Sequence, residues 1–269
     1  MLHVRSAPTP SVVRAGLHNH STCSDGRLSP AALVDAAERA GYEAFAITDH
    51  NSIEGWRALG TLPDWVIPGI ELSALADDGT ELHILGLGVR ARGPLVEHSR
   101  AFQAIYDEIW AEGLAAVDAD GRAGTPAPVL DPVQRETTLN RLGERAMSSA
   151  ALRAWESIHA RYHRDKLRPL MPSWRDAVAW LRGADARVGL AHPHRYRRVP
   201  EIADVIASVD AVEVVHPSHN AEHRAYWFDL AQRLGKASWA SHDFHGWSPA
   251  QRAAFDTPLA IDPRLSGLF

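Results

Sequence analysis

The residues with the clearest chemical potential are histidines and carboxylates that follow predicted strands. His18 and His20 form a His-Asn-His segment, and Asp243 and His245 are likewise two residues apart. In an extended chain, residues two apart point to the same side, so each pair can reach one ion. Imidazole is a common metal ligand, and the 15 histidines outnumber the 5 tyrosines and 6 phenylalanines together. These pairs predict a metal site.

Further metal-type residues stand singly at the ends of other predicted strands. The complete predicted ligand set is His18, His20, Asp25, His50, Glu71, His83, His192, Asp243 and His245. Six imidazoles and three carboxylates without a thiolate suit Zn, Mn or Fe better than Ca or Mg. At roughly four to five ligands per ion, the set can serve two or three divalent ions. Such a cationic pocket would attract phosphate and lower the pKa of bound water.

The elements that must position these residues alternate between strand and helix. Strands are predicted at residues 15–19, 44–48, 65–73, 81–89, 187–191, 211–215 and 236–240. The first helix is expected to have Ser29 as its cap and Pro30 at its first position, and to end before Gly41. Repeated strand and helix predict an α/β fold with a parallel sheet, open or closed into a barrel. The carboxyl ends of its strands would then bring the predicted ligands together.

The middle of the chain departs from this alternation, because residues 95–117 and 138–168 both have helical patterns. We therefore expect residues 1–94 to form the first part of a barrel, 95–172 a helical insertion or cap, and 173–269 the remainder. His159 and His163 of the insertion lie away from the strand ends and are predicted to be structural or solvated.

Composition excludes several classes of protein. The 269 residues are 45% hydrophobic and 23% charged, as in ordinary globular proteins, and no apolar run reaches the length that crosses a bilayer. The net charge of −5 argues against an extended nucleic-acid surface. The single cysteine, Cys23, excludes an internal disulfide framework and leads us to expect a cytoplasmic protein. Nothing in the sequence indicates an oligomeric state.

The metal-type residues, in order, resemble the PHP (polymerase and histidinol phosphatase) family of metal-dependent phosphoesterases. The resemblance covers roughly residues 16–246, is weak in the middle, and is greatest to short stand-alone members. Its segments are His18-Asn19-His20, Ser24-Asp25-Gly26, Thr48-Asp49-His50-Asn51, Pro68-Gly69-Ile70-Glu71, His83-Ile84-Leu85-Gly86, Ala191-His192-Pro193 and Asp243-Phe244-His245. It implies a distorted, seven-stranded, TIM-like β/α barrel with a trinuclear metal site.

The resemblance also implies how the ligands divide among three ions. The first ion would take His18, His20, Glu71 and Asp243, the second Glu71, His83 and His192, and the third Asp25, His50 and His245. Asp49 would orient its neighbour or a ligand. The Gly-Arg-x-His-Ile-Ala-Arg segment that short members use for substrate is absent, and residues 140–145 are the nearest stretch.

The predicted activity is that of a metal-dependent phosphatase. A hydroxide that bridges two ions would attack a small phosphomonoester, and a nucleotide mono- or bisphosphate is one candidate substrate. Arg195, three residues after His192, can form paired hydrogen bonds with a phosphate group. The resemblance also places a phosphate-contacting arginine there. His219 can hydrogen-bond the phosphate or protonate the leaving oxygen.

Three alternatives remain at this point. The first is a phosphodiesterase or exonuclease that acts on oligonucleotides, against which the negative net charge counts. The second is a metal-binding module without catalytic activity. The third is a C–N hydrolase of the amidohydrolase type, whose sites commonly use a modified lysine; Lys166 and Lys236 lie at no matching strand end.

Overall fold

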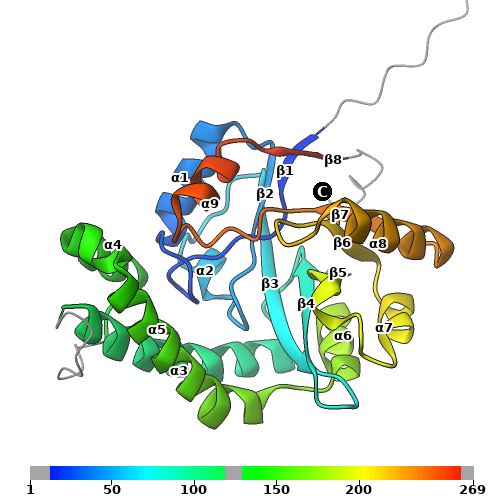
Figure 1. Ribbon diagram of the computed structural model, residues 1–269, viewed down its shortest axis with the longest axis horizontal. Coiled ribbons are helices and arrows are strands. Elements are labelled where there is room, and N and C mark those ends of the chain that lie inside the picture. The colour runs from blue at the N-terminus through cyan, green and yellow to red at the C-terminus, as the bar shows by residue number, and fades with distance from the viewer. Residues whose placement is uncertain (1–12, 119–128, 262–269) are drawn as a thin grey trace, which may run out of the picture.

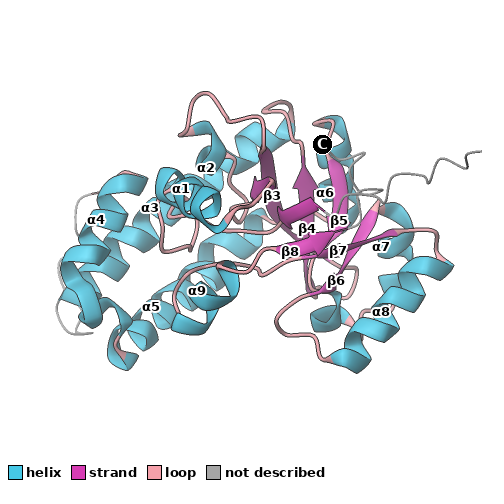
Figure 2. Cartoon of the chain, turned by 90° about the horizontal axis from the view of Figure 1, so that it is seen from above, coloured by secondary structure: helices cyan, strands magenta, loops and turns pink. Residues whose placement is uncertain are grey.

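The computed structural model describes residues 13–118 and 129–261, which form a mixed β-sheet surrounded by helices. The strands are β1 (Val13–Gly16), β2 (Ala44–Ile47), β3 (Val66–Leu75), β4 (Glu81–Leu87), β5 (Arg187–Leu190), β6 (Ala211–Val215), β7 (Ala237–Ala240) and β8 (Leu259–Ile261). The helices are α1 (Pro30–Ala40), α2 (Glu54–Arg57), α3 (Pro94–Asp118), α4 (Pro132–Leu142), α5 (Ser149–Tyr162), α6 (Trp174–Gly183), α7 (Ile202–Ser208), α8 (Ala221–Arg233) and α9 (Pro249–Phe255). Both views show the strands between α3–α5 on one side and α7 and α8 on the other (Figures 1 and 2).

The sheet curls into a nearly closed barrel of seven strands. Its order is β7-β6-β5-β4-β3-β2-β1-β8, and β8 pairs antiparallel with the outer side of β1. The chain just after β1 meets the chain just after β7 in a parallel bridge between Asn19 and Phe244. There the His20 amide donates to the Phe244 carbonyl at 2.9 Å. The predicted α/β barrel is confirmed, and its closure lies directly beside His18, His20, Asp243 and His245.

One strand runs against the predicted direction. The expectation of a parallel sheet is wrong at β4, which pairs antiparallel with both β3 and β5. Only a short turn joins β3 to β4, and a parallel connection would need a crossover of a dozen or more residues. His83 stands near the beginning of β4. Because β4 is reversed, its beginning lies at the same rim as the carboxyl ends of the parallel strands.

Local sequence signals define α1 as predicted. The Ser29 side chain accepts a hydrogen bond from the Ala32 amide at the beginning of the helix. Gly41 follows its last residue with a φ of 79°, a conformation that glycine adopts without steric cost. The helix buries Leu33, Val34 and Ala37 against the barrel.

Helices α3, α4 and α5 occupy the chain between β4 and α6 and share an apolar core of their own. Phe102, Trp110, Leu139 and Ile158 are buried in this core, apart from the residues that fill the barrel. The division at residues 95 and 172 remains a prediction. In the parts of the chain that the structure describes, no helix combines the length and apolar character needed to span a bilayer.

The junction between α3 and the barrel contains a buried histidine that predicts acid sensitivity. His98 donates from Nε2 to the Asn51 side-chain oxygen at 3.0 Å, and burial lowers its pKa to about 4. In the unfolded chain, the histidine pKa is near 6.5. Between about pH 4 and pH 6.5, His98 is therefore protonated in the unfolded chain and neutral in the folded chain. Stability is full above about pH 6.5 and should fall by up to about 3 kcal/mol as the pH drops toward 4.

A substitution isolates this effect from the other histidines. His98→Gln keeps an N–H donor but does not titrate, so its unfolding free energy should depend less on pH than that of the wild type over this interval. Urea unfolding of both proteins from pH 7 to pH 4 measures the difference. Parallel stability curves for the two proteins would show that His98 carries no such penalty.

Candidate metal centre

The structure brings the predicted ligands together at one end of the barrel. Three overlapping groups have ligand atoms that all lie within 4.8 Å of one another. They are His18, His20, Glu71 and Asp243; His50, Glu71 and His83; and His20, Asp25, His50 and His245. His192 is connected to these groups through Glu71, because His192 Nε2 lies 3.1 Å from Glu71 Oε1. All nine predicted ligands are therefore within reach of this cluster.

Glu71 lies at the centre of the cluster. It projects from the middle of β3 and is fully buried. One carboxylate oxygen, Oε2, lies 3.0 Å from both His18 Nε2 and His50 Nδ1. The other, Oε1, lies 3.0 Å from His83 Nδ1. A carboxylate that faces imidazoles on both oxygens has the arrangement expected of a ligand shared by two ions.

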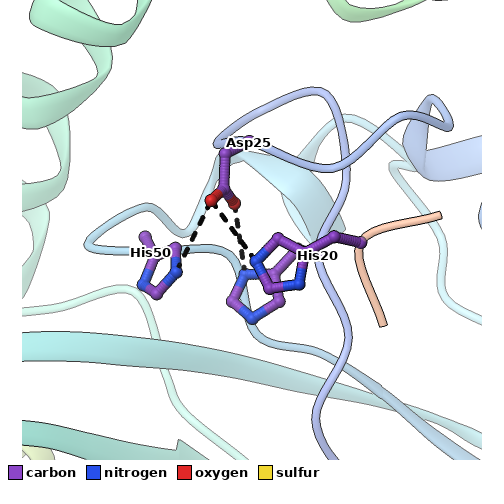
Figure 3. A group of neighbouring side chains, drawn as sticks. His20, Asp25 and His50 are labelled. Carbon is purple, nitrogen blue, oxygen red and sulfur yellow. Dashed lines mark ion pairs between the residues drawn. The ribbon is translucent and has the colours of Figure 1, made fainter. Parts of the chain in front are cut away.

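Asp25 gathers a second set of imidazoles. Its carboxylate lies 3.8 Å from nitrogens of His20 and His50 and 3.3 Å from His245 Nε2. Figure 3 shows the rings of His20 and His50 turned toward this carboxylate. Asp25 comes from the loop after β1, His50 from the loop after β2 and His245 from the loop after β7.

Several buried nitrogen and oxygen atoms in the cluster make no hydrogen bond. They include His18 Nε2, His20 Nδ1 and Glu71 Oε2. His18 Nε2 and Glu71 Oε2 lie 3.0 Å apart but do not form a hydrogen bond. Burying polar atoms without partners is costly, whereas lone pairs that point at a common place suit a cation. The residues therefore fit divalent metal ions.

The charges of the cluster support the same fit. Burial alone would raise the pKa values of Asp25, Glu71 and Asp243, but the surrounding imidazoles outweigh it and hold all three well below their usual range. Burial opposes protonation of His83 and His245 as well, yet nearby carboxylates raise their pKa values to about 9 and about 10. The carboxylates therefore stabilise positive charge in the cluster. Without metal, protons on the imidazoles supply this charge, and bound metal ions would supply it in their place.

Two residues that sequence reasoning missed fix the outer side of ligand rings. Glu213 Oε1 accepts from His18 Nδ1 at 3.0 Å, and its Oε2 accepts from the His192 amide at 2.7 Å. The Tyr196 hydroxyl lies 2.8 Å from His192 Nδ1. The sequence does contain a signal that could have identified Glu213. It is a carboxylate within the otherwise apolar strand β6, and a buried carboxylate needs polar partners.

Asp49 lies beneath the cluster and orders the loop after β1. Its carboxylate accepts from the Ser21 amide and hydroxyl, both at 2.7 Å, and from the Ser24 hydroxyl at 2.6 Å. The side chain is buried, so it acts through the loop that carries His20 and Asp25. From the helical side, Trp110 donates to the Ser24 carbonyl at 2.7 Å.

A cavity of about 330 Å³ opens beside the cluster. Asp25, His50, His83 and Arg195 belong to its barrel side. The helices between β4 and α6 supply a facing wall of Phe102, Tyr106, His159, His163, Leu167 and Met171. The structure therefore places His159 and His163 in the cavity wall, whereas their sequence positions predicted no link to the site.

Comparison with known proteins finds a family similarity in the first third of the chain. The family model described as "PHP domain" matches residues 16–91, which contain His18, His20, Asp25, His50, Glu71 and His83. Over this segment, the chain is similar to PHP domains.

Relatives with assigned activities align with most of this chain. A 3',5'-nucleoside bisphosphate phosphatase of Chromobacterium violaceum is 26% identical over 85% of this chain and 86% of that protein. A phosphoribosyl 1,2-cyclic phosphate 1,2-diphosphodiesterase of Eggerthella lenta is 27% identical over 86% of this chain and 93% of that protein. A 5'-3' exoribonuclease of Escherichia coli is 27% identical over 85% of this chain and 84% of its own length.

Two solved structures share the overall fold of this chain. A Chromobacterium violaceum protein, described as an amidohydrolase with bound sulfate and no metal, has a TM-score of 0.62 and 26% identity; the match covers 93% of this chain and 92% of that one. A candidate metal-dependent phosphoesterase of Bifidobacterium adolescentis has a TM-score of 0.60 and 22% identity over 97% of this chain and 96% of its own. The second likeness concerns the fold alone.

The two remaining predicted residues differ in their relation to the candidate metal centre. Arg195 is half exposed in the cavity wall, with Nη2 3.7 Å from Asp243 Oδ2. His219 is buried, donates from Nδ1 to the Val214 carbonyl at 2.9 Å, and is not among the residues that line the cavity. His216 stands between His219 and the cluster, and its Nε2 lies 3.1 Å from Asp243 Oδ2.

Proposed function

We propose that this protein is a metal-dependent phosphoesterase of the PHP type that hydrolyses a small phosphomonoester, with a nucleotide as the leading candidate. The observation that carries the proposal is the buried carboxylate of Glu71 with imidazoles on both oxygens, next to a cavity that contains Arg195. The relatives support the reaction class, because their names describe cleavage of phosphate esters.

The proposed ligand sets are those that the resemblance implies; one coincides with a geometric group, and the other two assign His20, His50 or His192 differently. His18, His20, Glu71 and Asp243 would hold one ion, Glu71, His83 and His192 a second, and Asp25, His50 and His245 a third. Zn, Mn and Fe all suit these donors. When bound, such ions supply Lewis-acid polarisation of phosphate and a nucleophilic hydroxide at neutral pH.

The chain's own residues would bind and orient the substrate. The guanidinium of Arg195 can reach phosphate oxygens from the cavity wall and offer paired N–H donors. Tyr106 and Phe102 offer apolar ring surfaces to a leaving group in the same cavity. A volume of about 330 Å³ lies at the lower end of the range for small-molecule sites, which supports a small substrate.

A second candidate, hydrolysis of oligoribonucleotides, has a specific observation in its favour. A larger groove of about 970 Å³ beside α9 is lined by Arg27, Arg252, Asn140 and Trp247, side chains that suit phosphates and bases. Arg27 and Trp247 are each two residues from a proposed ligand, Asp25 and His245. The flanking nucleotides of a longer substrate could bind in this groove, next to the proposed metal centre.

A substrate panel with added Mn²⁺ separates these functions. It contains nucleoside monophosphates, 3',5'-bisphosphates, a cyclic phosphodiester and short oligoribonucleotides. Highest kcat/KM on a mono- or bisphosphate supports the first proposal, and processive loss of nucleotides from the oligomer supports the second. Tight metal binding without turnover of any substrate would overturn both proposals in favour of a binding module.

Arg195 is predicted to act on substrate affinity. Because hydrogen bonds to charged groups contribute about 1.5–3 kcal/mol, Arg195→Ala should lower kcat/KM about 10- to 100-fold, mostly through KM. Arg198→Ala, an exposed arginine in the same segment, provides the matched control. Steady-state kinetics on the best substrate of the panel would measure both. Equal kinetic constants for the Arg195 variant and the wild type would remove this residue from the site.

A further inference from the structure

The ring of His83 is held on its outer side by Glu81. His83 Nδ1 faces the central carboxylate of Glu71 at 3.0 Å, and Nε2 lies 3.2 Å from Glu81 Oε1. A carboxylate oxygen only accepts, so Nε2 donates. Glu81 and His83 are two residues apart on β4 and therefore project from the same face. This matches the relation of Glu213 to His18 on the other side of the cluster.

Glu81 is itself held from outside the barrel. Its second oxygen, Oε2, accepts from His163 Nε2 at 2.7 Å. His163 begins the π-helical turn, residues 163–167, that follows α5. A continuous chain of contacts therefore runs from the helices between β4 and α6, through His163, Glu81 and His83, to Glu71.

We infer that His163 fixes Glu81 and that Glu81 fixes the ring of His83, so that the helices between β4 and α6 set the metal affinity of the His83 position. Both residues are positioning residues. This inference rests on the proposed function, in which His83 holds a metal ion.

The physical reason is preorganisation. A metal-bound imidazole commonly donates its other N–H to a carboxylate, which fixes the ring orientation and raises its basicity. A glutamate side chain has three torsions, and ordering a side chain of this kind costs up to about 1.5–2 kcal/mol. The bond from His163 orders Glu81 before metal arrives, so this cost does not weaken metal binding. All three side chains also line the cavity, where they are only partly exposed.

The test titrates Mn²⁺ into the metal-free full-length protein by calorimetry. Glu81→Gln should weaken the affinity of one site about 10- to 100-fold, the range typical of partners that orient a ligand. His163→Phe should weaken the same site by a smaller factor. His163→Gln, which keeps an N–H donor, should restore affinity toward that of the wild type. With saturating Mn²⁺, kcat of these variants should recover.

A matched control comes from a neighbouring contact between the same segments. Arg168 follows the same turn and donates to the Gly79 carbonyl in the turn between β3 and β4. Arg168→Gln removes this contact without touching Glu81, so its Mn²⁺ affinity should equal that of the wild type. His163→Phe added to Glu81→Gln should cause no further loss, because both substitutions break one chain of contacts.

Four outcomes would overturn the inference. The first is Mn²⁺ affinity equal to that of the wild type in Glu81→Gln or in folded His163→Phe. The second is a loss of Mn²⁺ affinity in Arg168→Gln as large as that in His163→Phe, because it would indicate an effect of packing alone. The third is an additive loss in the double variant. In these three cases the proposed centre stands if the wild type binds Mn²⁺ and His83→Ala loses affinity. Absence of Mn²⁺ binding by the wild type would remove the centre itself and this inference with it.

Discussion

Glu71→Gln is expected to lower phosphoesterase turnover by about 10³- to 10⁴-fold and to reduce the metal content of the purified protein. Glu71 contacts His18 and His50 with one oxygen and His83 and His192 with the other. An amide presents only one oxygen, and it carries no charge, so two proposed ion positions lose a shared ligand at once. Metal ions supply several kcal/mol of transition-state stabilisation, which corresponds to this loss in rate.

Elemental analysis and phosphate release measure the two parts of this prediction. Glu97→Gln, an exposed residue on α3, makes the same chemical change away from the centre and should leave both quantities unchanged. Full metal content together with wild-type turnover in Glu71→Gln would contradict the central role of this carboxylate. Reduced metal with turnover restored by excess Mn²⁺ would confine the role of Glu71 to metal retention.

Removal of metal by a chelator is expected to lower the melting temperature by about 8–16 °C. A ligand that binds only the folded chain, at about 1,000 times its dissociation constant, stabilises that chain by about 4 kcal/mol. For a chain of this size, each kcal/mol corresponds to about 2–4 °C. The metal-free centre keeps buried carboxylates and imidazoles crowded together, including Glu71 Oε2, which makes no hydrogen bond.

Thermal unfolding of the metal-free protein, with and without added Mn²⁺ at fixed pH, provides the measurement. Glu71→Gln under the same two conditions is the control, and its shift should be much smaller. Identical melting temperatures for the wild type with metal and without it would show that no tight site forms in the folded chain.

The ligand chemistry could be predicted from the sequence because it depends on local relations. Two residues of an extended segment share a side, which placed His18 beside His20. Strands alternating with helices predicted an α/β sheet, open or closed; the resemblance implied the barrel, and the structure confirms it. Ser29 and Gly41 marked the ends of α1 because capping involves only neighbours in the chain. How the ligands divide among ions remains a prediction.

Tertiary structure decided what no local pattern contains. The reversal of β4 brings His83 to the rim through pairing with β3 and β5. Glu213 reaches His18 across 195 residues of chain, and His163 reaches Glu81 across 82. Side-chain type and spacing set what each residue can bond, but the partner of a buried polar group is set by which distant segment the packed core brings against it.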